Sequence, residues 1–371
     1  MIVGVPKEVK TNEYRVGIIP AGVKMLVRHG HQVIIETGAG LGSSIPDEQY
    51  VAAGASIIST AEEVYATADL IMKVKEPQPQ EIPLLRPGQI LYAYLHLAPE
   101  PDLTKALMNR GVTGVAFETI QLPDGSLPLL VPMSEVAGRM SVQVGARFLE
   151  KEHGGRGVLL GGVPGVSRGR VAIIGAGIVG HAACKIAIGL GAEVDIIDIN
   201  PQRLHYLDDI FGSRVVTLMS NEDNIAAAVK QAHLVIGAVL IPGAKAPKLV
   251  TREMVSTMRR GTVVVDVSID QGGCVETSRV TSHHEPTFVL DGVIHYGVPN
   301  IPGAVSRTST FALANSTISY ALAMADKGFV EAVWADPSLA KGVNVYQGYV
   351  TYEAVACDVG CEFRELATLM S

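Results

Sequence analysis

No stretch of about 20 residues in this 371-residue sequence stays apolar without glycine, proline or charge, so a membrane-spanning helix is not expected. The first residues contain no basic segment followed by an apolar core, so a signal peptide is not expected either. The net charge of −7 argues against nucleic acid as the main partner. Because charged residues make up only 18% of a chain that is 48% hydrophobic, we expect a globular rather than a disordered protein. Since no signal peptide is expected, a cytoplasmic location is expected.

Cysteine is scarce as well, with four residues in the whole chain. Their spacing fits no zinc motif, so no metal ligands are predicted, although the sequence does not reveal whether the protein needs a metal ion. Cys357 and Cys361 are four residues apart in a predicted helix, which would place both thiols on one face. A metal-binding pair is one interpretation, but free thiols in a reducing cytosol are the favoured one.

Glycine, in contrast, is abundant: its 39 residues are about a tenth of the chain, against an average of about 7%. Gly175, Gly177 and Gly180 have the G-x-G-x-x-G spacing and follow Val171–Ile174, an apolar run that predicts a buried strand. Gly175 would permit the tight turn, Gly177 the approach of a pyrophosphate, and Gly180 the close packing of a helix at 181–190. The amino terminus of that helix favours an anion.

A second apolar run, Glu193–Ile197, ends at Asp198, about 20 residues further on. A carboxylate there can accept hydrogen bonds from a ribose 2′-OH and repel the 2′-phosphate of NADP. A glycine fingerprint alone is weak, because glycines also mark ordinary loops. Between a strand and a helix, and with the acid in place, it predicts an NAD site; the alternative is a βαβ unit without a ligand.

The first 130 residues alternate apolar runs with helical patterns, which predicts a parallel sheet with helices on both faces. The expected strands are 2–5, 32–36, 68–75, 90–95 and 112–117, and the expected helices are 20–29, 47–53 and 102–110. Four ionisable residues lie at or beyond the ends of these strands: Arg15, Lys75, His96 and Glu118. Each alone is explained by a solvated loop charge, but ligands of open α/β sheets bind at these ends, so the four together predict a site.

Further strands are expected at 215–218, 234–239, 262–268 and within 289–298, with a helix at 224–231. Two long helical stretches, 132–151 with Ser134 as its N-cap and 307–327, bracket the nucleotide-binding unit, and three short elements follow the second. This order predicts an α/β fold of two domains, each with a mostly parallel sheet. A Rossmann NAD-binding domain, 132–305, would be inserted into a discontinuous substrate domain, 1–131 and 306–371, with the ligands held in the cleft between them.

Motifs along nearly the whole chain resemble, in register, those of the alanine dehydrogenase family. They are Val5-Pro-Lys-Glu-Val-Lys with Glu13-Tyr-Arg-Val, Lys73-Val-Lys-Glu-Pro77, Tyr94-Leu-His-Leu-Ala98, Gly161-Gly-Val-Pro-Gly-Val166, Asp266-Val-Ser-Ile-Asp-Gln-Gly-Gly-Cys274, and Asn300-Ile-Pro-Gly-Ala with Arg307-Thr-Ser-Thr. Ser306 departs from the pattern, because a proline is expected there before the return helix.

The resemblance implies reversible NAD-dependent oxidative deamination of L-alanine to pyruvate and ammonia. It implies that Arg15 and Lys75 bind the carboxylate and carbonyl of pyruvate and that His96 is the general acid/base. Asp270 would handle proton transfer and position ammonia or water. The resemblance also implies a homo-oligomer, usually a hexamer, and nucleotide contacts from the second domain: Ser134, Ile178, Val179, Asp198, Arg203, Ser220, Val239, Leu240, Val267, Ser268, Ile269, Asp270, Arg279, Val298, Pro299, Asn300 and Ile301.

These residue types suit the chemistry independently of the family. Oxidation at Cα places a hydride on nicotinamide and leaves an iminium, to which water adds before ammonia departs. A histidine with an ordinary pKa near 6.5 can both take and return the protons. Lys75 and Arg15 would compensate substrate charge, the arginine through a bidentate grip on a carboxylate. Since Asp270 lies on the other domain, the constellation is expected to assemble when the cleft closes.

Two other functions stay open. The NAD-binding component of a proton-translocating transhydrogenase resembles this fold, but it would be a binding module without substrate chemistry of its own. In that protein no aspartate is expected after the strand that begins at Val263, whereas Asp270 and His96 are both present here. A saccharopine or other opine dehydrogenase would instead condense a keto acid with a larger amine. A purely structural role would leave the site residues idle.

Overall fold

The computed structural model describes residues 1–239 and 246–370, which divide into two compact units. Unit 1 consists of Met1–Met133 and Val305–Ser371, and unit 2 of Ser134–Ala304. Unit 1 is therefore discontinuous in sequence, with unit 2 inserted into it. Each unit contains one mostly parallel sheet, so the predicted α/β fold class is confirmed.

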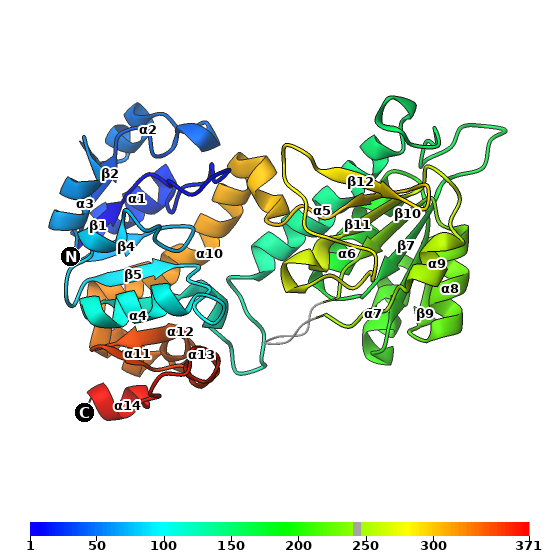
Figure 1. Ribbon diagram of the computed structural model, residues 1–371. Coiled ribbons are helices and arrows are strands. Elements are labelled where there is room, and N and C mark those ends of the chain that lie inside the picture. The colour runs from blue at the N-terminus through cyan, green and yellow to red at the C-terminus, as the bar shows by residue number, and fades with distance from the viewer. Residues whose placement is uncertain (240–245, 371) are drawn as a thin grey trace. The chain divides into compact units, whose positions relative to one another are not determined.

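Unit 1 is built on an eight-stranded sheet in the order β15-β14-β6-β5-β4-β1-β2-β3 (Figure 1). Strands β1 to β6 are parallel, and β14 and β15 extend the sheet beyond β6 in antiparallel fashion. Successive strands are added on one side of β1 up to β3 and on its other side from β4 onward. The carboxyl ends of β1 and β4 therefore form a topological switch point. The strands are β1 (Ile2–Val5), β2 (Gln32–Glu36), β3 (Ser56–Ile58), β4 (Leu70–Met72), β5 (Ile90–Ala93), β6 (Thr113–Ala116), β14 (Val343–Tyr346) and β15 (Tyr349–Val350).

Helices cover both faces of this sheet. Buried apolar side chains of α3, α4 and α13 pack with strand residues such as Ile71 and Leu91 in one core. On the sheet's other side the Tyr92 hydroxyl of β5 donates to the carbonyl of Thr317 in α10 at 3.1 Å. The helices are α1 (Pro20–Arg28), α2 (Asp47–Ala52), α3 (Ala61–Thr67), α4 (Pro101–Arg110), α10 (Ser306–Lys327), α11 (Phe329–Ala335), α12 (Pro337–Gly342), α13 (Glu353–Val359) and α14 (Leu366–Met370).

Unit 2 has a seven-stranded sheet in the order β12-β13-β11-β10-β7-β8-β9, with only β12 antiparallel (Figure 1). Here the order in which strands are added reverses between β7 and β10, which are parallel neighbours. The second switch point therefore lies beside the glycine fingerprint. The strands are β7 (Arg170–Ile174), β8 (Glu193–Asp198), β9 (Val215–Met219), β10 (Leu234–Gly237), β11 (Val263–Asp266), β12 (Thr287–Leu290) and β13 (Val293–Tyr296).

The helices of unit 2 also sandwich its sheet. Buried residues of α8 and α9, among them Val229 and Val255, pack on Val235 and Val264 of the sheet. A Cβ atom at Gly180 of α6 would lie 3.3 Å from the side chain of Ile173, so α6 packs against β7. The helices are α5 (Val131–Phe148), α6 (Ile178–Gly189), α7 (Pro201–Phe211), α8 (Glu222–Gln231) and α9 (Arg252–Ser256).

Several predicted elements differ from those observed. The strands expected at 68–75 and 90–95 end at Met72 and Ala93; two residues further on, the N–H groups of Val74 and Leu95 donate to side-chain carboxylates and not to a neighbouring strand. Ser134 is the fourth residue of α5, so it is not the predicted N-cap. Ser306 is the first residue of α10, a position that suits proline, and its hydroxyl donates to the carbonyl of Gly42 at 2.6 Å. Six helices and strands, not three, follow α10.

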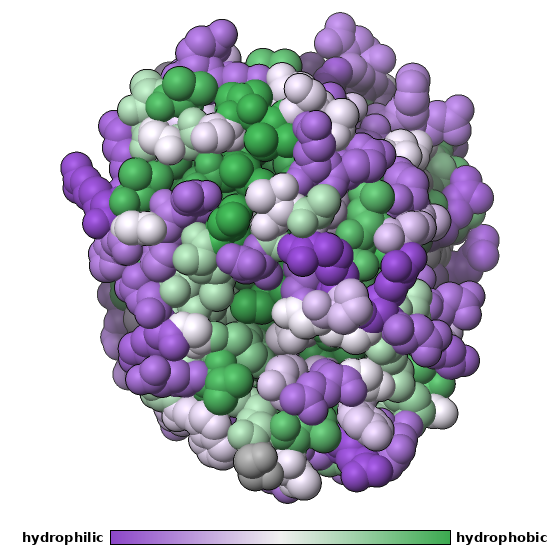
Figure 2. Space-filling model, turned by 90° about the vertical axis from the view of Figure 1, so that its left-hand side faces the viewer, coloured by the Kyte–Doolittle hydropathy of each residue, from purple (hydrophilic) through white to green (hydrophobic). Residues whose placement is uncertain are grey.

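In the parts of the chain that the structure describes, no helix combines the length and the hydropathy that a bilayer crossing requires. Figure 2 shows both hydrophilic and apolar residues on the visible face, with apolar residues gathered mainly in its upper part and hydrophilic residues around its rim.

Candidate functional site

The four ionisable residues predicted for unit 1 all follow parallel strands at their carboxyl ends. Arg15 lies in the segment after β1, Lys75 after β4, His96 after β5 and Glu118 after β6. These strands are neighbours in the sheet, so the residues share one edge. Lys75 and Arg15 are close enough that the guanidinium charge lowers the pKa of the lysine.

Arg15 is almost completely buried, and Glu13 engages one edge of its guanidinium. The Nε and Nη2 groups donate to the two carboxylate oxygens at 2.6 and 2.5 Å, and the backbone N–H of Arg15 adds a third bond at 3.1 Å. Burial opposes the charged form, yet the hydrogen bonds and charge of Glu13 raise the pKa of Arg15. The cation therefore stays charged, and its Nη1, 3.1 Å from the sulfur of Met133, lies on the edge that Glu13 does not engage.

Lys75 is a half-buried cation that pairs with no carboxylate among the described residues. Among residues 1–239 and 246–370, no carboxylate oxygen lies within the 4.0 Å that defines an ion pair with its ammonium. Burial lowers the pKa of Lys75, and the positive charge of Arg15 lowers it further. An unpaired ammonium in this setting favours an anionic ligand.

Lys73, two residues earlier, shows the opposite arrangement. It is fully buried, and its ammonium lies 2.7 Å from an oxygen of Glu81 and 3.1 Å from one of Glu8. The Tyr65 hydroxyl also donates to Glu81, at 2.9 Å. Although burial disfavours the charge, Glu8 and Glu81 raise the pKa of Lys73. Sequence reasoning missed this network; a lysine next to the apolar run Leu70–Met72 is its one local signal.

His96 is exposed and has φ +49°, in the left-handed region that few residues with a side chain adopt. Its ring stacks on that of Tyr94, with centroids 5.9 Å apart and an interplanar angle of 18°. Tyr94 is held in turn by its hydroxyl, which donates to the carbonyl of Leu129 at 2.6 Å. Glu118 accepts the backbone N–H of His96 at 2.6 Å and that of Leu95 at 3.2 Å.

The glycine fingerprint of unit 2 has the geometry that its spacing predicts. Gly175 has φ +103°, and a Cβ atom there would lie 2.5 Å from the carbonyl oxygen of Ala238 on the neighbouring strand end. A Cβ atom at Gly180 would lie 1.8 Å from the carbonyl oxygen of Gly175, so the first turn of α6 packs directly against the glycine turn. A Cβ atom at Gly177, the N-cap of α6, would meet nothing within 4 Å. The space that Gly177 leaves open lies in front of a helix amino terminus, where phosphates bind.

Asp198 stands at the end of β8, beside this turn. One carboxylate oxygen accepts the N–H of Ala176 at 2.6 Å and the other that of Asn200 at 2.8 Å. Ser220 lies at the neighbouring strand end and donates its N–H to the carbonyl of Asp198 at 2.9 Å. Arg203 is in the first turn of α7, whose N-cap is Asn200. These three predicted nucleotide residues therefore lie at the same edge as the fingerprint.

A second group of predicted residues follows β10 and β11. The N–H of Val239 is bonded to the hydroxyl of Ser268 at 3.0 Å, which connects the two strand ends. Asp270 is exposed in the short 3₁₀ helix Val267–Gln271, and Gly272 and Gly273, with φ +87° and +78°, form the turn after it. Leu240 lies outside the described residues.

The remaining residues predicted to contact the nucleotide differ in how far their side chains are exposed. Ile178 is 38% exposed at the start of α6, beside the half-buried Val179. In contrast Ile269, Val298 and Ile301 are buried, so a ligand would meet their backbone. Pro299 and Asn300 lie between Val298 and Ile301, and Asn300 has φ +53°. Ser134 is half-buried in α5. The guanidinium of Arg279 lies over the ring of Phe288, 4.3 Å from its centroid.

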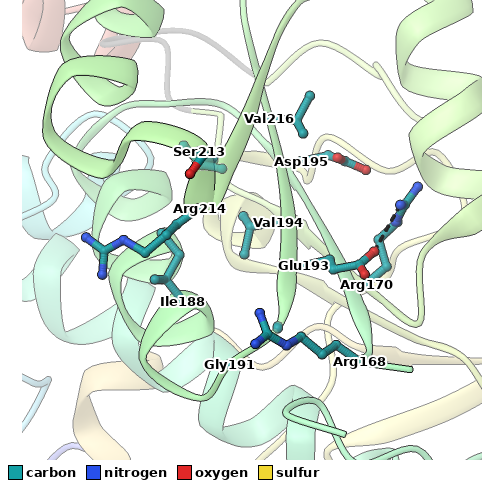
Figure 3. Close-up of a pocket in the computed structure, with 12 residues that line it drawn as sticks. Arg168, Arg170, Ile188, Gly191, Glu193, Val194, Asp195, Ser213, Arg214 and Val216 are labelled. Atoms are coloured by element: carbon teal, nitrogen blue, oxygen red, sulfur yellow. Dashed lines mark hydrogen bonds and ion pairs between the residues drawn. The ribbon is translucent and has the colours of Figure 1, made fainter. Parts of the chain in front are cut away.

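A separate cavity of about 410 Å³ lies at the opposite edge of the unit 2 sheet (Figure 3). Arg170 and Glu193, which begin β7 and β8, pair across it at 3.0 Å, and Arg168 and Arg214 line it as well. Amino ends of strands are not where α/β sheets bind nucleotides, so the cavity is distinct from the predicted site. Within the described ranges, only Glu150, Glu152 and His153 approach one another closely enough to share a metal ion, and both glutamates are exposed.

Comparisons with known proteins show which family the chain belongs to. Family models described as the alanine dehydrogenase/PNT N-terminal and C-terminal domains match residues 4–137 and 141–353. An alanine dehydrogenase of Methanococcus maripaludis is 63% identical over 357 residues, which cover 96% of this chain and 96% of the relative. A solved L-alanine dehydrogenase has a TM-score of 0.95 and 53% identity, with 97% of this chain and 99% of that chain covered. A transhydrogenase from Sinorhizobium meliloti has a TM-score of 0.82 and 29% identity, with 95% and 100% covered.

Proposed function

Because the chain belongs to the alanine dehydrogenase/PNT family, we propose that it is an NAD-dependent L-alanine dehydrogenase. In the proposed reaction L-alanine, NAD⁺ and water give pyruvate, ammonium, NADH and a proton, and the reaction is reversible. Unit 1 would be the substrate domain and unit 2 the nucleotide domain. Assembly into a homohexamer stays a prediction from the family resemblance, and a cytoplasmic location stays a prediction from the sequence.

Lys75 is the observation that carries the proposal for the substrate. Its ammonium has no carboxylate partner among the described residues, whereas the neighbouring Lys73 has two. Lys75 lies close to Arg15 at a switch point, and two such cations suit a small anion with a second polar oxygen. Pyruvate, with a carboxylate beside its carbonyl, has that form. Since Glu13 engages the Nε edge of Arg15, we propose that the substrate carboxylate binds the Nη1 edge.

His96 would exchange the protons of the reaction. Its exposed ring can reach a ligand at the sheet edge, and an imidazole suits a step that needs a base in one direction and an acid in the other. Asp270, the proposed partner for water or ammonia, is likewise exposed, on the unit that carries the fingerprint.

NAD fits the residues of unit 2. The pyrophosphate would lie at the amino terminus of α6, where Gly177 leaves open space, and Asp198 would accept the ribose hydroxyls. A carboxylate oxygen has lone pairs for more than one hydrogen bond, so the bonds from Ala176 and Asn200 leave that role open. When bound, the nicotinamide supplies the hydride acceptor. The further contacts proposed from the resemblance stay predictions.

The transhydrogenase alternative is the weaker one. The identity to the transhydrogenase structure is 29%, against 53% to the L-alanine dehydrogenase structure over a similar share of the chain. A binding module would also have no use for an unpaired Lys75 next to Arg15. The opine alternative predicts room for a larger amine, and no described feature favours it.

A steady-state assay with NAD⁺ and a panel of amino acids, and with NADH, ammonium and a panel of keto acids, tests the proposal. L-Alanine and pyruvate are expected to give the highest kcat/KM. NADH binding without turnover of any amino acid would support the transhydrogenase reading. Turnover that requires a keto acid together with an amino acid would support the opine reading.

A further inference from the structure

Each functional residue proposed for unit 1 donates its own backbone N–H to a glutamate. Arg15 donates to Glu13 at 3.1 Å, Lys75 to Glu8 at 3.4 Å, and His96 to Glu118 at 2.6 Å. Glu8 and Glu118 also accept the N–H of the preceding residue, at 2.6 and 3.2 Å. Bonds of this kind hold the backbone at the points where the functional side chains leave it.

We propose that Glu118 is a positioning residue, which acts on the reaction through His96 by holding the left-handed turn that aims its imidazole. The proposal rests on the function proposed above. It goes beyond the sequence analysis, which placed Glu118 among the site charges without a role for it.

The backbone of His96 explains why such a group is needed. With φ +49° the residue occupies a region that side chains disfavour, so other contacts must select it. Glu118 supplies two N–H···carboxylate bonds, which are stronger than bonds to a neutral acceptor. It reaches His96 from the end of β6, the next strand, in the 3₁₀ helix Phe117–Thr119.

The ring of His96 is supported separately from its backbone. It stacks on Tyr94, which packs edge-on against Phe117 with centroids 5.0 Å apart. Loss of Glu118 would therefore free the turn while the aromatic support and the fold remain. The predicted result is a misplaced imidazole in an otherwise intact protein.

A double-mutant cycle tests this role. We expect Glu118→Ala to lower kcat about 10²-fold, since a displacement of about 1 Å can cost that much. The Kd for NADH should be unchanged. In a His96→Ala background the same change should lower the residual kcat by less than about twofold, because the residue through which it acts is gone. Glu118→Gln, which keeps one oxygen acceptor, should lie between wild type and Glu118→Ala.

The proposal would be overturned if Glu118→Ala lowered kcat by the same factor in wild type and in the His96→Ala background, or lowered it in neither. Glu62→Ala, which removes an exposed glutamate of α3, is the matched control and should be silent. If Glu118→Ala does not fold, Glu118→Gln completes the cycle. Amide hydrogen exchange at His96 gives a readout without turnover: it should be faster in Glu118→Gln, and unchanged exchange would contradict the anchoring. If wild type does not oxidise alanine, the proposed function fails while the exchange experiment still decides the anchoring.

Discussion

The carboxylate of Asp198 accepts the backbone N–H of Ala176 at 2.6 Å, so the acid at the end of β8 ties down the glycine turn after β7. The sequence predicts Asp198 only as a residue that faces the cofactor, where it binds the ribose and repels a 2′-phosphate. The structure gives it a second task, because the turn and the acid are parts of one hydrogen-bonded unit. Replacement of the whole side chain would disturb both tasks at once.

Asp198→Asn separates charge from shape. The amide keeps an oxygen for one N–H but no longer repels a 2′-phosphate. We expect the ratio of kcat/KM for NAD⁺ over NADP⁺ to fall about tenfold, which corresponds to about 1.4 kcal/mol. Asp209→Asn, on the exposed face of α7, is the control and should keep the wild-type ratio. A ratio that is the same in Asp198→Asn as in wild type would remove the residue from cofactor selection.

Gly177 and Gly180 form a matched pair for the nucleotide site. A Cβ atom at Gly180 would lie 1.8 Å from the carbonyl of Gly175, so Gly180→Ala should lower stability by about 1–3 kcal/mol, as overpacking does. At Gly177 nothing lies within 4 Å, so Gly177→Ala should melt like wild type but bind NADH about tenfold more weakly or worse. Thermal melts and NADH titrations of both variants give the comparison. Wild-type NADH affinity in Gly177→Ala would argue that the open space is not the pyrophosphate site.

Local sequence signals predicted the scaffold of this site well. The glycine spacing and the apolar runs before Asp198 are short-range patterns, and the structure gives Gly175 and Gly180 the predicted turn and packing. The carboxylates that hold the functional residues were missed, because Glu8 meets Lys75 and Glu118 meets His96 only after the sheet has formed.

Lys75→Met tests whether the Lys75 ammonium contributes to turnover while it lowers the free energy of unfolding. Burial and Arg15 lower the pKa of Lys75 below its ordinary value of 10.5, so the folded state disfavours the charged form relative to the unfolded chain. We expect Lys75→Met to unfold at higher urea concentration than wild type at about pH 7 while losing most turnover. This gain in the free energy of unfolding over wild type should be complete at pH values below the lowered pKa. It should vanish as the pH rises to about 10.5, because the lysine of wild type is then neutral in both the folded and the unfolded state.

Lys24→Met is the control for Lys75→Met, since Lys24 is exposed on α1 and should change neither stability nor turnover. A Lys75→Met protein that is less stable than wild type, or fully active, would show that the cation is held for structure.

Asp270→Asn tests the second proposed proton-handling residue. The amide keeps the shape and most hydrogen bonds but removes the charge. We expect folded protein that binds NADH and has lost about 10²-fold or more in kcat in both directions, as for loss of a general acid/base. If Asp270 only stabilises the turn before Gly272, turnover should stay nearly normal with at most a modest loss in Tm. Asp208→Asn, on the exposed side of α7, is the matched control.

The central claim is that this chain moves the hydrogen on Cα of L-alanine to a dinucleotide. The most direct measurement uses L-alanine deuterated at Cα and determines the mass of the NADH and pyruvate formed. The account predicts one deuterium in each NADH and none that came from Cα in the pyruvate. NADH without deuterium, or dinucleotide binding with no alanine-dependent NADH at all, would contradict it.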